Sequence, residues 1–65
     1  MDLLARTRNE IEINFLYLIS LKEEDDLNLF FYQKNKIVGM IDLATALGII
    51  SKDEAMNNFS KLHRI

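Results

Sequence analysis

The amino-acid sequence predicts an all-α fold: a small three-helix bundle of two long antiparallel helices and a short third helix, in a single helical domain over residues 1–65. Three observations lead to this prediction. The chain has no proline and only two glycines, so few positions interrupt a helix. Apolar residues recur three and four positions apart along most of the chain, as on one face of a helix. Around Gly48 the chain carries the signals of one helix ending and another beginning.

The first predicted helix runs from about Asp2 to Ile19, and the Asp2 carboxylate is suited to accept from the free N–H groups of its first turn. The expected inward face comprises Leu4, Ile11, Phe15 and Leu18, widened by Leu3, Leu16 and Ile19. Residues 11–21 also carry apolar side chains at every second position, so a strand remains an alternative for this stretch. We favour the helix because residues 3–10 show no such alternation and contain good helix formers.

The second predicted helix runs from about Leu21 to Leu47. Ser20 and Glu23 have the spacing of a capping box. The acidic run of residues 23–26 would then occupy the first turns, where negative charge complements the helix dipole. The expected inward face comprises Leu27, Phe30, Phe31, Val38, Ile41 and Ala44, extended by Ile37, Met40, Leu43 and Leu47.

The third predicted helix, from about Lys52 to His63, follows the clearest turn signal in the chain. Gly48 suits the left-handed position just past a helix end. Ser51 and Glu54 form a second possible capping box. We expect the inward side chains of this helix to be Ala55, Phe59 and Leu62.

Composition indicates a protein that needs a partner chain. A domain of 65 residues buries too little surface for a robust core, and the absence of cysteine excludes disulfides and thiolate metal sites. Hydrophobic residues nevertheless make up 49% of the chain. We therefore expect a homo-oligomer, most simply a dimer, and another protein is the alternative partner. The residues expected to pack between chains are Phe15, Leu16, Ile19, Phe30 and Phe31.

Charge and hydropathy do not indicate a membrane protein, and they give only a weak indication of nucleic-acid binding. Net charge is −2; residues 1–33 carry three basic and seven acidic side chains, and residues 34–65 carry five basic and three acidic ones. No charge-free stretch approaches the roughly 18 residues of a membrane span, and no targeting segment is recognisable. We expect a cytoplasmic protein with a mildly basic C-terminal half.

The sequence offers no recognisable catalytic, cofactor or metal site, so we expect no enzyme activity and no cofactor. The only histidine, His63, lies in the last turn of the third predicted helix, where positive charge is favoured. The acidic run at residues 23–26 lacks the alternating ligands and the glycine of a calcium loop. With two isolated glycines, the chain has no phosphate-binding loop.

Residues 41–51 and the helix after them resemble the helix-turn-helix of bacterial regulators. The matching positions are Leu43, Ala44, Leu47, Gly48 and Ile49. The resemblance implies DNA contacts from the third helix, for which the candidates are Asn57, Asn58, Lys61 and Arg64. Two features depart from the pattern: one extra residue follows Gly48, and the helix opens with the acids Asp53 and Glu54, which DNA phosphates repel.

Two functions are therefore expected from sequence. The first is a small non-enzymatic interaction or regulatory protein, of a kind common in bacteria and their phages, that acts through an oligomeric helical surface. The alternative is a small DNA-binding transcriptional regulator that uses residues 41–64.

Overall fold

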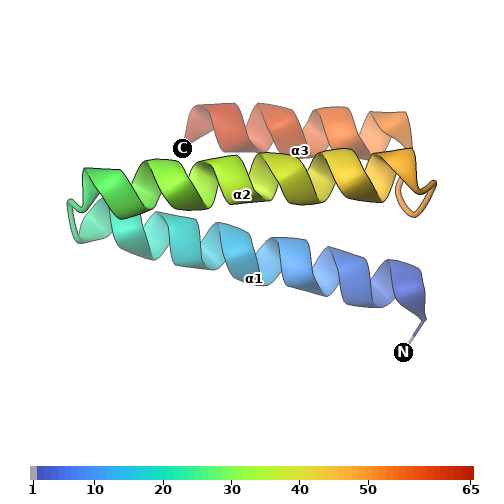
Figure 1. Cartoon of the computed structure of the whole chain (residues 1–65), viewed down its shortest axis with the longest axis horizontal. Coiled ribbons are helices and arrows are strands. Elements are labelled where there is room, and N and C mark those ends of the chain that lie inside the picture. Colours follow the sequence, from blue (N-terminus) through green and yellow to red (C-terminus); the bar gives the residue numbers. More distant parts are fainter. Residues whose placement is uncertain (1) are drawn as a thin grey trace.

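The computed structural model describes residues 2–65 and consists of three helices, α1 (Leu3–Glu23), α2 (Leu27–Ala46) and α3 (Lys52–Arg64) (Figure 1). No strand occurs within residues 2–65. The predicted all-α fold with a short third helix is confirmed. The strand alternative for residues 11–21 is wrong, because all of them lie in α1.

The helices lie side by side, with α2 antiparallel to both α1 and α3 (Figure 1). α1 and α2 have 21 and 20 residues, whereas α3 has only 13. Because α3 folds back from the far end of α2, it stops short of the α1–α2 turn (Figure 1). The half of the α1–α2 hairpin nearest its turn therefore has less cover than the other half.

The core is a narrow strip along the facing sides of the helices. The predicted inward residues Ile11, Phe15 and Leu18 of α1 are buried, as are Ala55 and Leu62 of α3. Its remaining buried apolar members are Leu21, Phe30, Ile37, Ile41, Ala44 and Ile50. A helix in contact with two neighbours buries only part of its circumference, so the wide apolar stripes leave a surplus on the surface.

The predicted inward face of α2 is too wide. Leu27, Phe31, Leu43 and Leu47 are all more than half exposed. Gln33, which was not predicted to be inward, is 2% exposed instead. Its Nε2 donates to the side-chain and backbone oxygens of Asn14, at 2.8 and 3.1 Å, so this polar group joins α1 to α2.

The predicted start of the second helix is also wrong. α1 continues through Ser20 to Glu23, and the N-cap of α2 is Asp26, whose carboxylate accepts from the N–H of Leu29 at 3.1 Å. The acidic run therefore occupies the end of α1 and the turn. Asp25 takes a left-handed conformation, φ 62°, that ends α1, so a helix stop falls where sequence indicated a helix start.

The predicted turn at Gly48 is confirmed, with φ 72° at this residue. Ser51 caps α3 as predicted, because its Oγ accepts from the N–H of Glu54 at 3.1 Å. The reciprocal half of that capping box is missing, since the Glu54 carboxylate accepts from Arg8 of α1 instead. Asp2 likewise caps α1, accepting from the N–H of Ala5 at 2.7 Å.

Candidate protein-interaction surface

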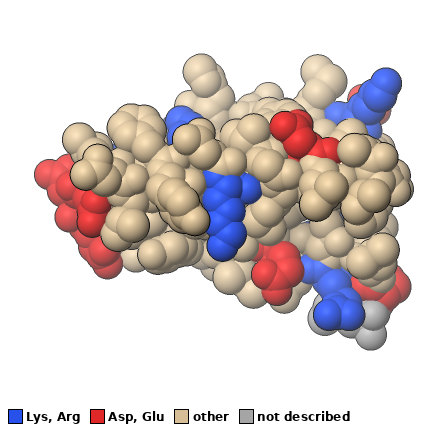
Figure 2. Space-filling model, viewed as in Figure 1, with Lys and Arg blue, Asp and Glu red and all other residues tan. Residues whose placement is uncertain are grey.

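Exposed apolar side chains are concentrated on the two long helices. Of the twelve large apolar residues that are exposed within residues 2–65, ten lie in α1 or α2 and only Met56 lies in α3. Soluble monomers rarely expose extended apolar patches, and such patches mark contact surfaces. In Figure 2 most of the visible face is uncharged, and acidic side chains gather at the end where the α1–α2 turn lies.

α1 has two flanks with different surroundings. Arg8, Glu12 and Phe15 line a cleft that α1 shares with α3. Thr7 and Glu10 line a separate groove of about 220 Å³ that α1 shares with α2, and no α3 residue lines it. The rest of this groove is apolar and comprises Ile11, Met40, Leu43, Ala44, Leu47 and Ile49.

The groove is part of a longer surface, which we call the hairpin face. It combines the groove with two rows of exposed residues, Leu3, Glu10 and Tyr17 on α1 and Leu29, Lys36 and Leu43 on α2. Residues in each row are seven positions apart, about two helical turns, so each row lies along one side of its helix. The hairpin face is thus a two-helix surface with apolar ends and one acid and one base at its middle.

The predicted interface residues separate into two groups. Phe15 and Phe30 are 1% and 8% exposed and belong to the core of the single chain. Leu16, Ile19 and Phe31 are 61%, 39% and 57% exposed. The rings of Phe30 and Phe31 meet edge to face, with 5.5 Å between their centroids. The exposed ring of Phe31 therefore lies directly against a core residue. These three exposed residues lie outside the hairpin face, Leu16 and Ile19 on α1 and Phe31 on α2.

The four predicted DNA contacts lie on one broad side of α3, since Lys61 and Arg64 follow Asn57 by four and seven positions, but part of this side borders α1. Asn58 and Lys61 line the cleft between α1 and α3, where the Lys61 Nζ lies 4.7 Å from the centroid of the Phe15 ring. Asn57 and Arg64 are exposed and seven positions apart, and the Arg64 Nε donates to the Ser60 carbonyl at 3.3 Å. A helix-turn-helix sets its two helices at about 90–120°. Here α2 and α3 lie antiparallel, as a helical hairpin (Figure 1).

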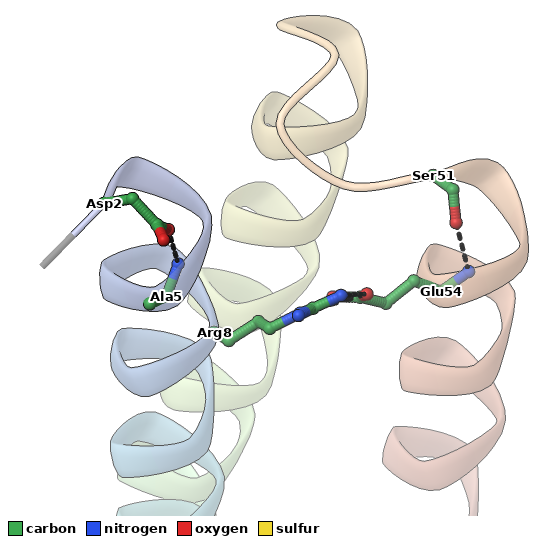
Figure 3. A network of polar contacts seen from close by, with 5 residues as sticks. All are labelled: Asp2, Ala5, Arg8, Ser51 and Glu54. Atoms are coloured by element: carbon green, nitrogen blue, oxygen red, sulfur yellow. Dashed lines mark hydrogen bonds and ion pairs between the residues drawn. The ribbon is translucent and has the colours of Figure 1, made fainter.

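Sequence reasoning missed the ion pair that closes the cleft. Arg8 reaches from α1 to the first turn of α3, where its Nη2 donates to Glu54 Oε1 at 2.6 Å and its Nε contacts both carboxylate oxygens at 3.2 Å (Figure 3). This hydrogen bonding holds the pKa of the Glu54 carboxyl below its usual value and raises the pKa of Arg8. No local pattern pairs residues this far apart in sequence.

The cleft beneath this pair has a volume of about 290 Å³ and an aromatic floor at Phe15. Its rim carries both signs of charge, from Arg8, Glu12, Glu54 and Lys61. Within residues 2–65 no cluster of histidine, aspartate and glutamate is arranged to hold a metal ion. The groove of the hairpin face differs from this cleft, because apolar side chains make up most of its lining.

Two further findings bear on function. Among residues 2–65, no helix has both the length and the apolar character that crossing a bilayer demands. The chain matches no known protein family, and neither the curated proteins nor the solved structures contain a significantly similar chain.

Proposed function

We propose that this protein is a non-enzymatic interaction protein that acts through the exposed apolar surface of its α1–α2 hairpin and assembles as a homodimer. The observation that carries the proposal is the placement of ten exposed large apolar residues on these two helices. Each Leu or Phe side chain that leaves water on binding contributes roughly 1.5–3 kcal/mol, so a few of them support a stable contact.

The decisive experiment measures the solution mass by size-exclusion chromatography with light scattering across a dilution series. The wild-type chain is expected to have twice the mass of the 7.6 kDa monomer at high concentration and to dissociate on dilution. A chain that stays monomeric up to millimolar concentration would overturn the homodimer.

Charge substitutions test whether the hairpin carries the contact. Leu43→Glu on the hairpin face and Phe31→Glu outside this face replace side chains that are exposed in the single chain, so each variant should keep its helical circular dichroism. At least one of them is expected to shift the protein to monomer. Met56→Glu is the matched control, because Met56 is the exposed apolar residue of α3, and it should leave the mass unchanged.

DNA binding is the second proposal. It rests on the confirmed stop at Gly48 and on the exposed basic side chains of α3, including Lys61 and Arg64. A salt-dependent shift of duplex DNA that weakens in Lys61→Ala would support it, since the removal of one phosphate contact lowers the salt slope by about one. The absence of any shift at low salt would exclude DNA binding.

A further inference from the structure

We infer that a second copy binds the hairpin face about a twofold axis that runs parallel to the helices, between α1 and α2, so that each Glu10 faces the Lys36 of the other copy. This inference rests on the proposed homodimer and adds its surface and register. It also leaves Leu16, Ile19 and Phe31 outside the interface.

The position of each residue along the hairpin axis, which we call its level, follows from how α1 and α2 pair within one chain. The hydrogen bond between Gln33 and Asn14 places these two residues at the same level. Counting along the antiparallel helices from that level puts Glu10 next to residue 37, so Glu10 and Lys36 lie at nearly the same level. The same count sets Leu3 near the level of Leu43.

The two rows of the hairpin face are complementary level by level. Leu3 on α1 matches Leu43 on α2, Glu10 matches Lys36, and Tyr17 matches Leu29, with residue numbers that add up to 46 in every pair. A twofold axis parallel to the helices keeps every residue at its level and exchanges the two sides of the face. It lays α1 of each copy antiparallel over α2 of the other, as neighbours lie in a four-helix bundle. All three pairs then form together, and each forms twice in the dimer.

Charge complementarity selects this axis. Glu10 and Lys36 are both exposed, and the one ion pair within residues 2–65 joins Arg8 and Glu54 instead. A twofold axis across the helices at this level would instead lay α1 over α1 and set Glu10 against Glu10. With the axis along the helices, the second copy supplies the opposite charge at both positions and an apolar side chain at the others.

The area of the surface is sufficient for a dimer. Two adjacent helices of about 20 residues, each roughly 30 Å long and 10 Å wide, present about 600 Å². Covering this face in two copies removes roughly 1,200 Å² from water, which is the lower bound for stable specific interfaces. The apolar groove at Met40 and Leu47 lies within this face and offers a recess for the side chains of the second copy.

A charge-reversal cycle tests the register. Glu10→Lys alone and Lys36→Glu alone each place like charges opposite one another twice per dimer. Each is expected to raise the dimer Kd at least about tenfold, and less so at high salt. The double variant restores both pairs with their signs exchanged, so its Kd should return to within about threefold of the wild-type value. Circular dichroism on each variant checks that the helices remain.

Cross-linking supplies an independent test. The chain has no cysteine, so only introduced thiols react. A mixture of Tyr17→Cys and Leu29→Cys chains, treated with a short bifunctional thiol reagent, is expected to form mixed dimers efficiently. A mixture of Tyr17→Cys and Leu43→Cys is the control for register, because these positions lie about 20 Å apart along the helices, and it should cross-link poorly. A mixture of Leu16→Cys and Leu29→Cys is the control for the surface, because Leu16 lies outside the hairpin face.

The outcomes separate this inference from the proposed function. A monomeric wild-type chain overturns both. A stable wild-type dimer in which the double charge reversal is no tighter than the single variants overturns the twofold register alone. Preferential cross-linking through Leu16 also overturns the register and would place the contact on the side of α1 that carries Leu16.

Discussion

The two turns of the molecule end their preceding helices with the same backbone motif but with different residues. In the first, Asp25 and Asp26 donate their N–H groups to the carbonyls of Lys22 and Leu21. In the second, Gly48 and Ile49 donate to the carbonyls of Thr45 and Ala44. Both are Schellman motifs with a left-handed residue, at φ 62° for Asp25 and 72° for Gly48.

The surroundings of the two turns differ in polarity. The first consists of the exposed acids Glu24, Asp25 and Asp26, and its last residue also caps α2. The second continues into Ile49 and Ile50, of which Ile50 is 4% exposed and belongs to the core. The same backbone motif can therefore be recognised in the sequence where glycine and apolar residues form it, but not where acidic residues do.

The largest effect is expected at the glycine of the second turn. Gly48→Ala forces a Cβ into the left-handed region, although no atom lies within 4 Å of the added Cβ. The strain alone should lower the free energy of unfolding by about 1–2 kcal/mol, measured by urea denaturation at one fixed chain concentration.

Gly39→Ala is the matched control for this substitution. Gly39 lies inside α2, and a Cβ there also meets nothing within 4 Å. Alanine favours the helix over glycine by about 0.5–1 kcal/mol, so Gly39→Ala should stabilise the protein. A destabilisation of equal size at both glycines would contradict the assignment of the Gly48 effect to its positive φ.

The N-caps that follow the two turns should have the next largest effects, and these should be similar to each other. Asp26→Ala removes the carboxylate that accepts from the N–H of Leu29, and Ser51→Ala removes the hydroxyl that accepts from the N–H of Glu54. Both hydrogen bonds measure 3.1 Å. Each should cost about 1 kcal/mol of unfolding free energy in the same urea titration. No loss at Asp26 would show that α2 starts elsewhere, for example at Ser20 as the sequence pattern indicated.

A smaller effect of opposite sign is expected in the first turn. Asp25→Gly relieves the strain of a side chain in the left-handed region. Glycine also gives the unfolded chain more freedom, which offsets part of this gain, so the net stabilisation should be about 0.5 kcal/mol. Thermal denaturation should show a higher Tm. Asp25→Asn separates the loss of charge from the backbone effect, because asparagine tolerates the same conformation. An equal gain in both variants would assign the effect to charge.

The smallest effect is expected at the ion pair between Arg8 of α1 and Glu54 in the first turn of α3. The folded protein lowers the pKa of Glu54 through its hydrogen bonds with Arg8. The pair therefore contributes stability above the ordinary glutamate pKa, and this contribution is lost as the pH falls through the lowered value. The Tm difference between wild type and Glu54→Gln should be small at pH 7 and shrink toward pH 3. The pair is exposed and is screened by salt.

Glu12→Gln is the control for the ion-pair measurement. Glu12 lines the same cleft but is not a member of the ion pair within residues 2–65. Its substitution leaves the Arg8–Glu54 contact in place, so the pH response of Tm that this contact causes should persist. An equal response of Glu12→Gln and Glu54→Gln would show that the general charge of the cleft, and not the Arg8 contact, governs the effect.

The sequence predicted the number of helices, the caps at Asp2 and Ser51, and the stop at Gly48. It misplaced the first turn, because Ser20 and Glu23 match a capping box by spacing while Asp25 carries no mark of its left-handed conformation. A signal for Gln33 was available: it lies three residues after Phe30 and four before Ile37, in the middle of the row that the structure buries. Because glutamine is polar, the hydrophobic pattern did not assign Gln33 to the buried row.

Local interactions explain what the sequence by itself determined. A cap or a helix stop involves residues within five positions of each other, so the identities of Asp2, Gly48 and Ser51 suffice. The tertiary structure alone decided which part of each apolar stripe is buried, that Gln33 meets Asn14 at a separation of 19 residues, and that Arg8 meets Glu54 at a separation of 46. These outcomes depend on which helix sides face each other, and α3 leaves the hairpin face uncovered because it packs on the other side of the hairpin.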